Sequence, residues 1–211
     1  KTPLQSIIGS AELLENGLVK PEDQPRFLSR IHQEADRLVA LINDILRLSQ
    51  LDEGGALPHE QVSVLELAQE AARSLTAQAA AQAVHISVTG TVGTVFGVRR
   101  LLYEIARNLC ENAVKYNVPG GSVTVEVAET DRDVALLVRD TGIGIPEGDQ
   151  SRVFERFYRV DKSHSRAIGG TGLGLSIVKH AVAYHHGTLR LESQLGKGTV
   201  ITVTLPKKPT E

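Results

Sequence analysis

The sequence predicts an α+β protein that consists of an N-terminal helical hairpin followed by an α/β sandwich. Two observations lead to this prediction. Apolar residues recur at three- and four-residue steps through the first fifty positions, whereas strands and helices mix after residues 52–58. The later strands come as hairpins rather than in strict strand–helix alternation, and this order is typical of an α+β sandwich.

The first predicted unit is a helical hairpin over residues 1–53, with a turn at Lys20–Pro25 that contains two prolines. Its apolar stripe comprises Leu4, Ile8, Ala11, Leu14 and Leu18, then Ile31, Ala35, Leu38, Leu41, Ile42, Ile45, Leu48 and Leu51. Two helices alone bury little apolar surface, so this stripe needs a partner. A homodimeric four-helix bundle is the solution we favour, and packing on the rest of the chain is the alternative.

Residues 54–60 are predicted to be a linker, and residues 61–207 a second domain. The expected helices cover Val62–Gln82, Arg99–Tyr116 and Leu173–His186, and the expected strands cover Val84–Thr89, Ser122–Glu129, Asp133–Arg139, Thr188–Ser193 and Thr199–Leu205. His185 and His186 close the last helix, where cationic side chains suit the helix dipole.

Charge and cysteine content narrow the possible partners and compartment. The formal net charge of −2 gives no reason to expect nucleic acid or an acidic membrane surface as a main partner. Cys110 is the one cysteine, so no disulfide framework exists and a reducing cytoplasm fits best. No apolar run approaches the length of a membrane span. We therefore expect a cytoplasmic fragment without membrane contact.

The helix Arg99–Tyr116 has a polar stripe beside its apolar one. Asn108, Asn112 and Lys115 lie at i, i+4 and i+7, on one side of the helix. Amide oxygens of the two asparagines suit Mg²⁺, which keeps most of its waters, and the lysine suits phosphate. The alternative is an exposed polar face without a ligand.

A predicted strand ends in Asp140, and Gly142 and Gly144 follow. The glycines permit close backbone approach, and the carboxylate can accept the exocyclic N–H of adenine. Guanine has an oxygen at that position and would be repelled, so Asp140 would select the base. A plain turn is the alternative.

Aromatic and charged residues then alternate over Val153–Asp161, ahead of a polar stretch and the glycine-rich Gly169–Gly174 at the start of a helix. This order is typical of a mobile lid with an aromatic hinge. Arg159 is the candidate to reach a γ-phosphate, and glycine-rich helix starts commonly hold phosphates. A solvated loop is the alternative.

Together these motifs resemble the cytoplasmic part of a sensor histidine kinase of two-component signalling. Arg107–Tyr116 is similar to that family's N box, Asp140–Gly144 to its G1 box, Phe154–Tyr158 to its F box and Gly170–Gly174 to its G2 box. The resemblance implies a Bergerat-type (GHKL) fold that binds ATP, with Mg²⁺ held by Asn112. The nucleotide-binding residues it implies are Asn108, Asn112, Lys115, Tyr116, Asp140, Gly142, Gly144, Arg159, Lys162, Gly170, Thr171, Gly172, Leu173 and Gly174.

The N-terminus resembles the end of the family's H box, because Lys1-Thr2-Pro3-Leu4 follows its pattern. The phosphoacceptor histidine would then lie three residues before Lys1, and Thr2 would orient water in a reverse phosphatase reaction. The resemblance further implies a response-regulator receiver domain as partner and a full-length protein anchored in the bacterial inner membrane.

A hydrolytic GHKL-type ATPase and a non-catalytic nucleotide-sensing dimerisation module are the alternative functions. Hydrolytic members of this class place a glutamate one turn before the metal-binding asparagine, where this chain has Asn108. A neutral amide cannot take a proton from water. Glu111 lies about 100° around the helix from Asn112. We therefore expect Asn108, Asn112 and Arg159 to serve phosphoryl transfer to a histidine.

Overall fold

The computed structural model describes residues 3–52, 57–160 and 171–208, apart from the side chains of residues 44 and 47–52. The helices are α1 (Pro3–Glu15), α2 (Gln24–Asp52), α3 (Val64–Ser74), α4 (Thr76–Ala81), α5 (Arg99–Lys115), α6 (Glu147–Gln150) and α8 (Gly174–Tyr184). The strands are β1 (Glu60–Ser63), β2 (His85–Gly90), β3 (Thr94–Gly97), β4 (Ser122–Glu129), β5 (Asp133–Asp140), β6 (Thr188–Gln194) and β7 (Gly198–Pro206).

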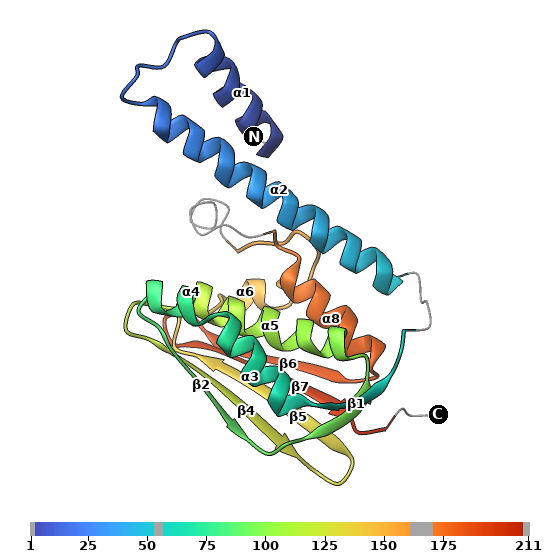
Figure 1. Ribbon diagram of the computed structural model, residues 1–211. Coiled ribbons are helices and arrows are strands. Elements are labelled where there is room, and N and C mark those ends of the chain that lie inside the picture. Colours follow the sequence, from blue (N-terminus) through green and yellow to red (C-terminus); the bar gives the residue numbers. More distant parts are fainter. Residues whose placement is uncertain (1–2, 53–56, 161–170, 209–211) are drawn as a thin grey trace.

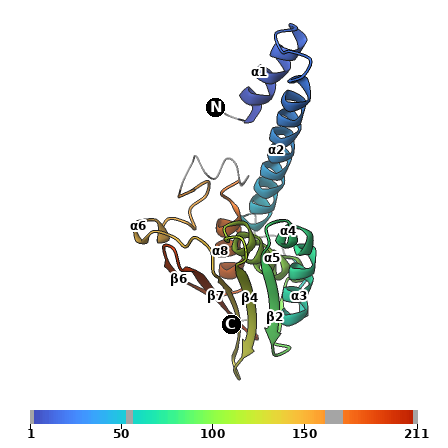
Figure 2. The same ribbon diagram turned by 90° about the vertical axis from the view of Figure 1, so that its left-hand side faces the viewer.

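The C-terminal part is a two-layer α/β sandwich (Figure 1). Its five-stranded sheet has the order β2-β4-β5-β7-β6, in which β2 and β4 are parallel and the other pairs are antiparallel. Helices α3, α4, α5 and α8 lie on one face of this sheet (Figure 2). Buried and more exposed side chains therefore alternate along the strands β4, β5 and β7. Val125, Leu136 and Val203 are among the buried ones. The predicted α+β architecture is confirmed.

One predicted helix, Val62–Gln82, is wrong in its bounds. Ser63 ends β1, and its hydroxyl oxygen accepts a hydrogen bond from the Glu66 backbone N–H at 3.3 Å, which caps α3. The helical run then breaks at Leu75 into α3 and α4. The two-stranded sheet of β1 and β3 was not predicted, because each strand has only four residues. Strand β1 begins at Glu60, inside the predicted linker.

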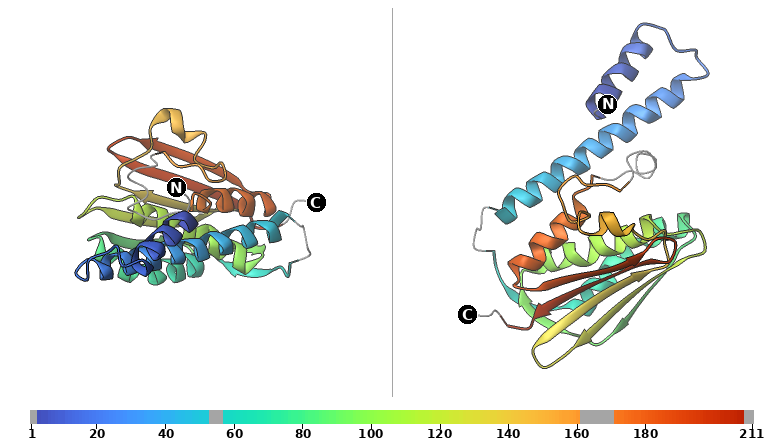
Figure 3. Two further views of the ribbon diagram at one scale, coloured as in Figure 1. Left: turned by 90° about the horizontal axis from the view of Figure 1, so that it is seen from above. Right: turned by 180° about the vertical axis from the view of Figure 1, so that it is seen from behind.

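The helical hairpin has α1 against α2, and α2 crosses above the helical layer of the sandwich (Figures 1 and 3). Leu41 packs on Leu173 and Ile177 at the start of α8, so this one stripe residue has its partner in the same chain. The large apolar side chains of the described hairpin that are exposed are Leu4, Ile8, Leu13, Leu18, Leu28, Val39, Ile42, Ile45 and Leu46. None of the described helices is long and apolar enough to span a membrane.

His185 lies buried where α8 ends, rather than as a cation at a helix terminus. Its Nδ1 donates to the Ala181 carbonyl at 2.8 Å, and its Nε2 accepts the Val98 backbone N–H at 3.0 Å. Val98 is the N-cap of α5. Gly97 makes room for the ring, because a Cβ there would lie 2.6 Å from the imidazole Cδ2. A neutral imidazole therefore supports the start of α5.

Substitution His185→Gln should make the stability of the chain less sensitive to acid. Burial lowers the pKa of His185, and the nearby His59 and His186 act in the same direction, although the bond to Ala181 raises it. A histidine whose pKa is lower in the folded chain than in the unfolded chain contributes free energy of unfolding above the unfolded pKa. This contribution is lost as the pH falls through the pKa of the folded chain. Urea unfolding of the wild type should lose more free energy than the variant between about pH 7.5 and about pH 5.

The exposed His85→Gln in β2 is the control, and its pH dependence should follow the wild type. Equal acid sensitivity in the wild type and the His185 variant would contradict the assignment of a neutral, buried imidazole.

Candidate functional site

Helix α5 places the two predicted asparagines opposite the first residue of α8. A Cβ at Gly174 would lie 2.9 Å from Asn108 Oδ1 and 3.8 Å from Asn112 Nδ2. Within the described residues, the Asn112 amide makes no hydrogen bond. The site therefore has an uncommitted amide beside a position that only glycine can occupy without displacing Asn108.

The Asn108 amide is already committed on its nitrogen side. Its Nδ2 donates to the backbone carbonyl of Glu104 at 2.8 Å and to Oε2 of the same glutamate at 3.4 Å. This leaves Oδ1 on the side of α8. Glu111 lies apart from this contact, because its carboxylate pairs with Arg107 at 3.7 Å along α5.

Asp140 ends β5 with its carboxylate fixed from two sides. Oδ1 accepts the backbone N–H of Gly142 at 2.9 Å and that of Thr199 at 3.2 Å. Burial raises the pKa of the Asp140 carboxyl, and these two hydrogen bonds partly oppose the shift. Among the described residues no donor reaches Oδ2. One carboxylate oxygen is thus held by the fold, and the other is available to a ligand.

The glycines after Asp140 are required by close backbone approach. A Cβ at Gly142 would lie 2.3 Å from the Tyr116 carbonyl oxygen, and that carbonyl accepts the Ile143 N–H at 3.1 Å. Gly144 has φ of +69°, and a Cβ there would lie 2.1 Å from the Gln194 carbonyl. The segment after β5 is thereby tied to the end of α5 and to the β6–β7 hairpin.

A polar network beneath this segment was not predicted. Asn117 Nδ2 donates to the carbonyls of Ala113 and Ser122, both at 3.0 Å. The Thr141 hydroxyl donates to Asn117 Oδ1 at 3.3 Å and accepts the Ser122 N–H at 2.9 Å. An asparagine just after a helix end is a common turn signal, but Ser122 begins β4 and Thr141 lies far along the chain, just after β5, so these partners need the fold to be known.

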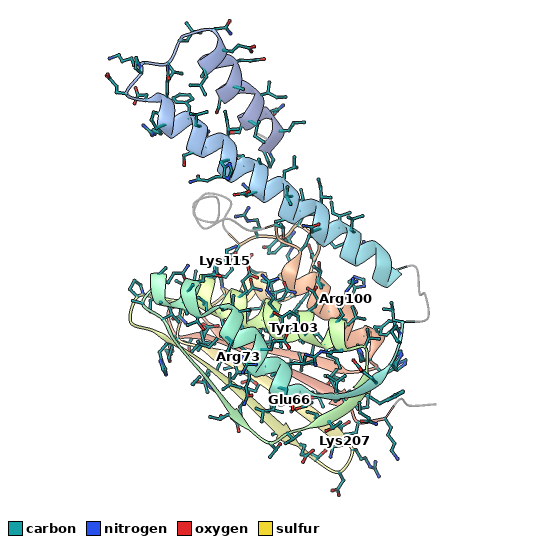
Figure 4. The ribbon with its side chains drawn as sticks, viewed as in Figure 1. Glu66, Arg73, Arg100, Tyr103, Lys115 and Lys207 are labelled. Carbon is teal, nitrogen blue, oxygen red and sulfur yellow. The ribbon has the colours of Figure 1, made fainter. Side chains whose placement is uncertain are left out.

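Cationic side chains gather where α5 ends. Lys115 lies on the side of the helical layer that faces α2 (Figure 4). Burial lowers the pKa of Lys115, Glu111 opposes the shift, and Arg159 and Arg37 add to it. Burial also raises the pKa of Tyr116, against the effect of Arg159. Arg159 therefore lies near the end of α5, and Arg37 of α2 is a further cation there that was not predicted.

The two sides of the predicted lid meet through their backbones. The Phe157 N–H donates to the Gly172 carbonyl at 3.0 Å, and Gly172 has φ of +75° with Phe157 backbone atoms 3.0 Å from its Cβ position. The Thr171 hydroxyl accepts the N–H of the buried Leu173 at 3.2 Å. Three predicted site residues, Thr2, Lys162 and Gly170, lie outside the described residues.

Residues 97–209 match the family described as "Histidine kinase-, DNA gyrase B-, and HSP90-like ATPase". The chain belongs to this ATPase family. Residues 1–54 also match the "His Kinase A (phospho-acceptor) domain". A phosphoacceptor domain joined to this ATPase domain identifies a two-component sensor histidine kinase, which confirms the resemblance found in the ordered motifs.

Known histidine kinases share this arrangement. The chain is 39% identical over 213 residues to the sensor-like histidine kinase SenX3 of Mycolicibacterium smegmatis, covering 99% of this chain and 55% of that protein. The structure of full-length ShkA in complex with AMPPNP is 27% identical, covers 99% of this chain and 44% of that one, and superposes with a TM-score of 0.74. The histidine kinase ThkA in complex with the response regulator TrrA has the same fold, at 21% identity, 98% and 58% coverage and a TM-score of 0.78. The chain thus spans about half the length of SenX3.

A histidine kinase ATPase domain binds ATP, and the described residues fit this ligand and Mg²⁺. Asp140 has one carboxylate oxygen that no described donor engages and that a base could reach, and Lys115 and Arg159 place positive charge near the end of α5, where it would suit phosphates. The Asn112 amide is an uncommitted hard-oxygen ligand, beside space that the missing side chain of Gly174 leaves.

Substitution Gly174→Ala is expected to lower ATP affinity by roughly tenfold while the chain stays folded. The new methyl group would press on Asn108 Oδ1, so the Asn108 amide would have to shift from its place in the site. The exposed Gly148→Ala is the control, since a Cβ there meets nothing within 4 Å. Titration calorimetry measures both affinities, and wild-type affinity in the Gly174 variant would refute the required close approach.

Proposed function

We propose that this chain is the core of an ATP-dependent protein-histidine kinase. It would phosphorylate a histidine on the helical hairpin and provide that phosphoryl group to an aspartate of a response regulator. The observation that carries the proposal is the pairing of a phosphoacceptor-type hairpin with a nucleotide site that has an amide, Asn108, one turn before Asn112. The AMPPNP complex of ShkA supports ATP as the nucleotide.

Each residue of the site has a role in this reaction. Asp140 accepts the adenine amino N–H, and the rigid segment through Gly142 and Gly144 fits the base closely. Lys115 and Arg159 stabilise negative charge on the phosphates. Asn112 would hold Mg²⁺, which neutralises phosphate charge when it is bound. The imidazole nitrogen would attack in line: the N–P bond forms, the bond from the γ-phosphorus to the β-bridging oxygen breaks, ADP leaves, and the ring N–H proton passes to solvent.

The arrangement of carboxylates near the site favours transfer over hydrolysis. Asn108 cannot act as a general base, and Glu111 is directed along α5 to Arg107. Glu104 accepts a hydrogen bond from Asn108, so its carboxylate is engaged inside the helix layer. No carboxylate of the described part of α5 is thus placed to activate water, and the hydrolytic ATPase alternative is not favoured.

The domain division and partners are part of the same proposal. Residues 1–53 form the dimerisation and phosphotransfer hairpin, 54–60 the linker and 61–207 the catalytic domain. The exposed apolar side chains of the hairpin, such as Ile42 and Ile45, would pair with a second copy in a four-helix bundle. A response-regulator receiver domain would dock on the hairpin, as a regulator accompanies ThkA. Thr2 would serve a reverse phosphatase reaction, and the full-length protein would be anchored in the inner membrane with this part in the cytoplasm.

Complementation in trans tests the kinase proposal. This chain is mixed with a longer protomer that carries the phosphoacceptor histidine but has Asn112→Asp, in the presence of ATP and Mg²⁺. Label from ATP should appear on the longer protomer as acid-labile phosphohistidine, and then on an added receiver domain. As a control, the longer protomer with its native Asn112 is incubated with ATP in the absence of this chain, which reports transfer within one protomer. If ATP binds but label appears on neither the longer protomer nor the receiver domain, the proposal is refuted. Rapid phosphate release without an acceptor would favour hydrolysis.

A further inference from the structure

Glu104 is an unusual residue for its position. It is only 7% exposed, and it is the one acidic side chain that is buried among the residues whose burial the structure describes. Carboxylates are rarely buried unless another group engages them. Glu104 also lies one turn before Asn108 and two turns before Asn112 on α5, so the buried carboxylate continues the polar stripe of the site into the core.

The contact between Glu104 and Asn108 decides which end of the amide faces the nucleotide site. An asparagine amide can present its oxygen or its nitrogen, because the two ends have nearly the same shape. Here Nδ2 donates to both the backbone carbonyl and Oε2 of Glu104. A carboxylate can only accept hydrogen bonds, so it opposes the flipped orientation in which Oδ1 would face it.

Oδ1 of Asn108 consequently faces α8. It is the nearest atom to the Cβ position of Gly174, at 2.9 Å, and among the described residues no donor engages it. An amide that presents oxygen suits a hard cation or the water that the cation carries, whereas an amide that presents nitrogen suits a phosphate oxygen. The orientation of this one side chain therefore selects between two different ligands.

We propose that Glu104 is a positioning residue that locks the Asn108 amide with its carbonyl oxygen towards the start of α8, so that Asn108 supports Mg²⁺ or its waters and does not donate to phosphate. This inference rests on the proposed function, because it assigns a part within the same nucleotide site. Glu104 itself touches neither nucleotide nor metal.

Substitution Glu104→Gln tests this role with little change in shape. A glutamine can turn its own NH₂ towards Asn108, so the side chain of residue 104 no longer opposes the flipped amide, and the backbone carbonyl of residue 104 is left as the acceptor of Nδ2. AMP-PNP affinity is measured by calorimetry with Mg²⁺ and with EDTA. The Mg²⁺ factor is the ratio of the AMP-PNP affinity with Mg²⁺ to that with EDTA, and we expect it to fall by roughly tenfold in the variant. The affinity measured with EDTA should stay within about twofold of wild type. The control is Glu66→Gln, the same chemical change on the exposed surface of α3, which should leave both affinities unchanged.

A double-mutant cycle separates positioning from a purely structural role. If Glu104 acts through Asn108, Glu104→Gln should have no further effect on the Mg²⁺ factor in an Asn108→Ala background. Additive effects, or an equal loss of affinity with and without Mg²⁺, would overturn the proposal. A wild type that binds no nucleotide would instead refute the proposed function, so the two failures are distinguishable.

A measurement on the wild-type chain does not depend on the variant being folded. In ¹⁵N NMR spectra the Asn108 side-chain NH₂, assigned by its absence from Asn108→Ala, should exchange slowly with solvent, because both acceptors on Glu104 engage it. Side-chain NH₂ exchange as fast as that of the exposed Asn43 would also overturn the proposal.

Discussion

Substitution Asp140→Asn is expected to lower the affinity of the chain for ATP by roughly 100-fold without unfolding it. The asparagine Oδ1 can keep both backbone hydrogen bonds, from Gly142 and Thr199. Its NH₂ then takes the place of the free carboxylate oxygen and meets the amino group of adenine, donor against donor. The same NH₂ can donate to the oxygen of guanine, so the preference for ATP over GTP should narrow. Calorimetric titration with both nucleotides measures these effects.

The stability of the same variant should change in the opposite direction. Burial raises the pKa of Asp140, so the stability that this carboxyl contributes is present below its unfolded pKa and is lost as pH rises through the folded value. At neutral pH the ionised carboxylate therefore costs stability that a neutral amide does not. Urea unfolding at about pH 7 should show the variant to be at least as stable as the wild type.

Asp131→Asn, in the exposed turn between β4 and β5, provides the matched control, because it makes the same change far from the site. It should leave ATP affinity unchanged. Wild-type ATP affinity in the Asp140 variant, or equal losses in both variants, would show that Asp140 does not contact the base.

The sequence was sufficient for residues whose positions follow from one regular element. Asn108, Asn112 and Lys115 share a side of α5 because helical spacing requires it, and Asp140 is the last residue of the central strand β5. The structure ties the segment after β5 to the end of α5, because the Ile143 N–H donates to the Tyr116 carbonyl. The order of the predicted residues along the chain, with the glycine-rich start of α8, was also enough to identify the family.

What the sequence could not supply depends on how separate elements pack. Arg37 approaches Lys115 only because α2 crosses the helical layer, and periodicity does not report where a helix crosses another. The spacing of Glu104 does not show that its carboxylate engages the Asn108 amide. His185 was expected to be a cation at a helix end, but its ring fills the space above Gly97. Contacts of this kind need the tertiary structure, because each joins residues from different elements or depends on burial.

Substitution Gly198→Ala should cause the largest loss of stability of the changes considered, roughly 3 to 5 kcal/mol. The sequence analysis placed this glycine simply in the turn between the last two strands. Its φ is +98°, and a Cβ would lie 2.0 Å from the Asp140 carbonyl oxygen and 3.0 Å from the Thr141 Cα. Because these are backbone atoms, no side chain can move aside. Strand β7 would have to separate from Asp140, which also removes the Thr199 N–H from its carboxylate.

Gly196→Ala, two residues earlier in the same turn, isolates the steric contribution. Gly196 also has a positive φ, +79°, but a Cβ there meets nothing within 4 Å, so its substitution should cost only about 1–2 kcal/mol of backbone strain. Urea unfolding measures both losses, and ATP titration in the remaining folded protein should show weakened binding for the Gly198 variant alone. If the two variants lost equal stability, the contact with Asp140 would contribute nothing, and the conformation of the turn would account for both glycines. The expected difference would show that the β6–β7 turn, which lies outside the four motifs named above, helps to position the carboxylate that we propose selects the base.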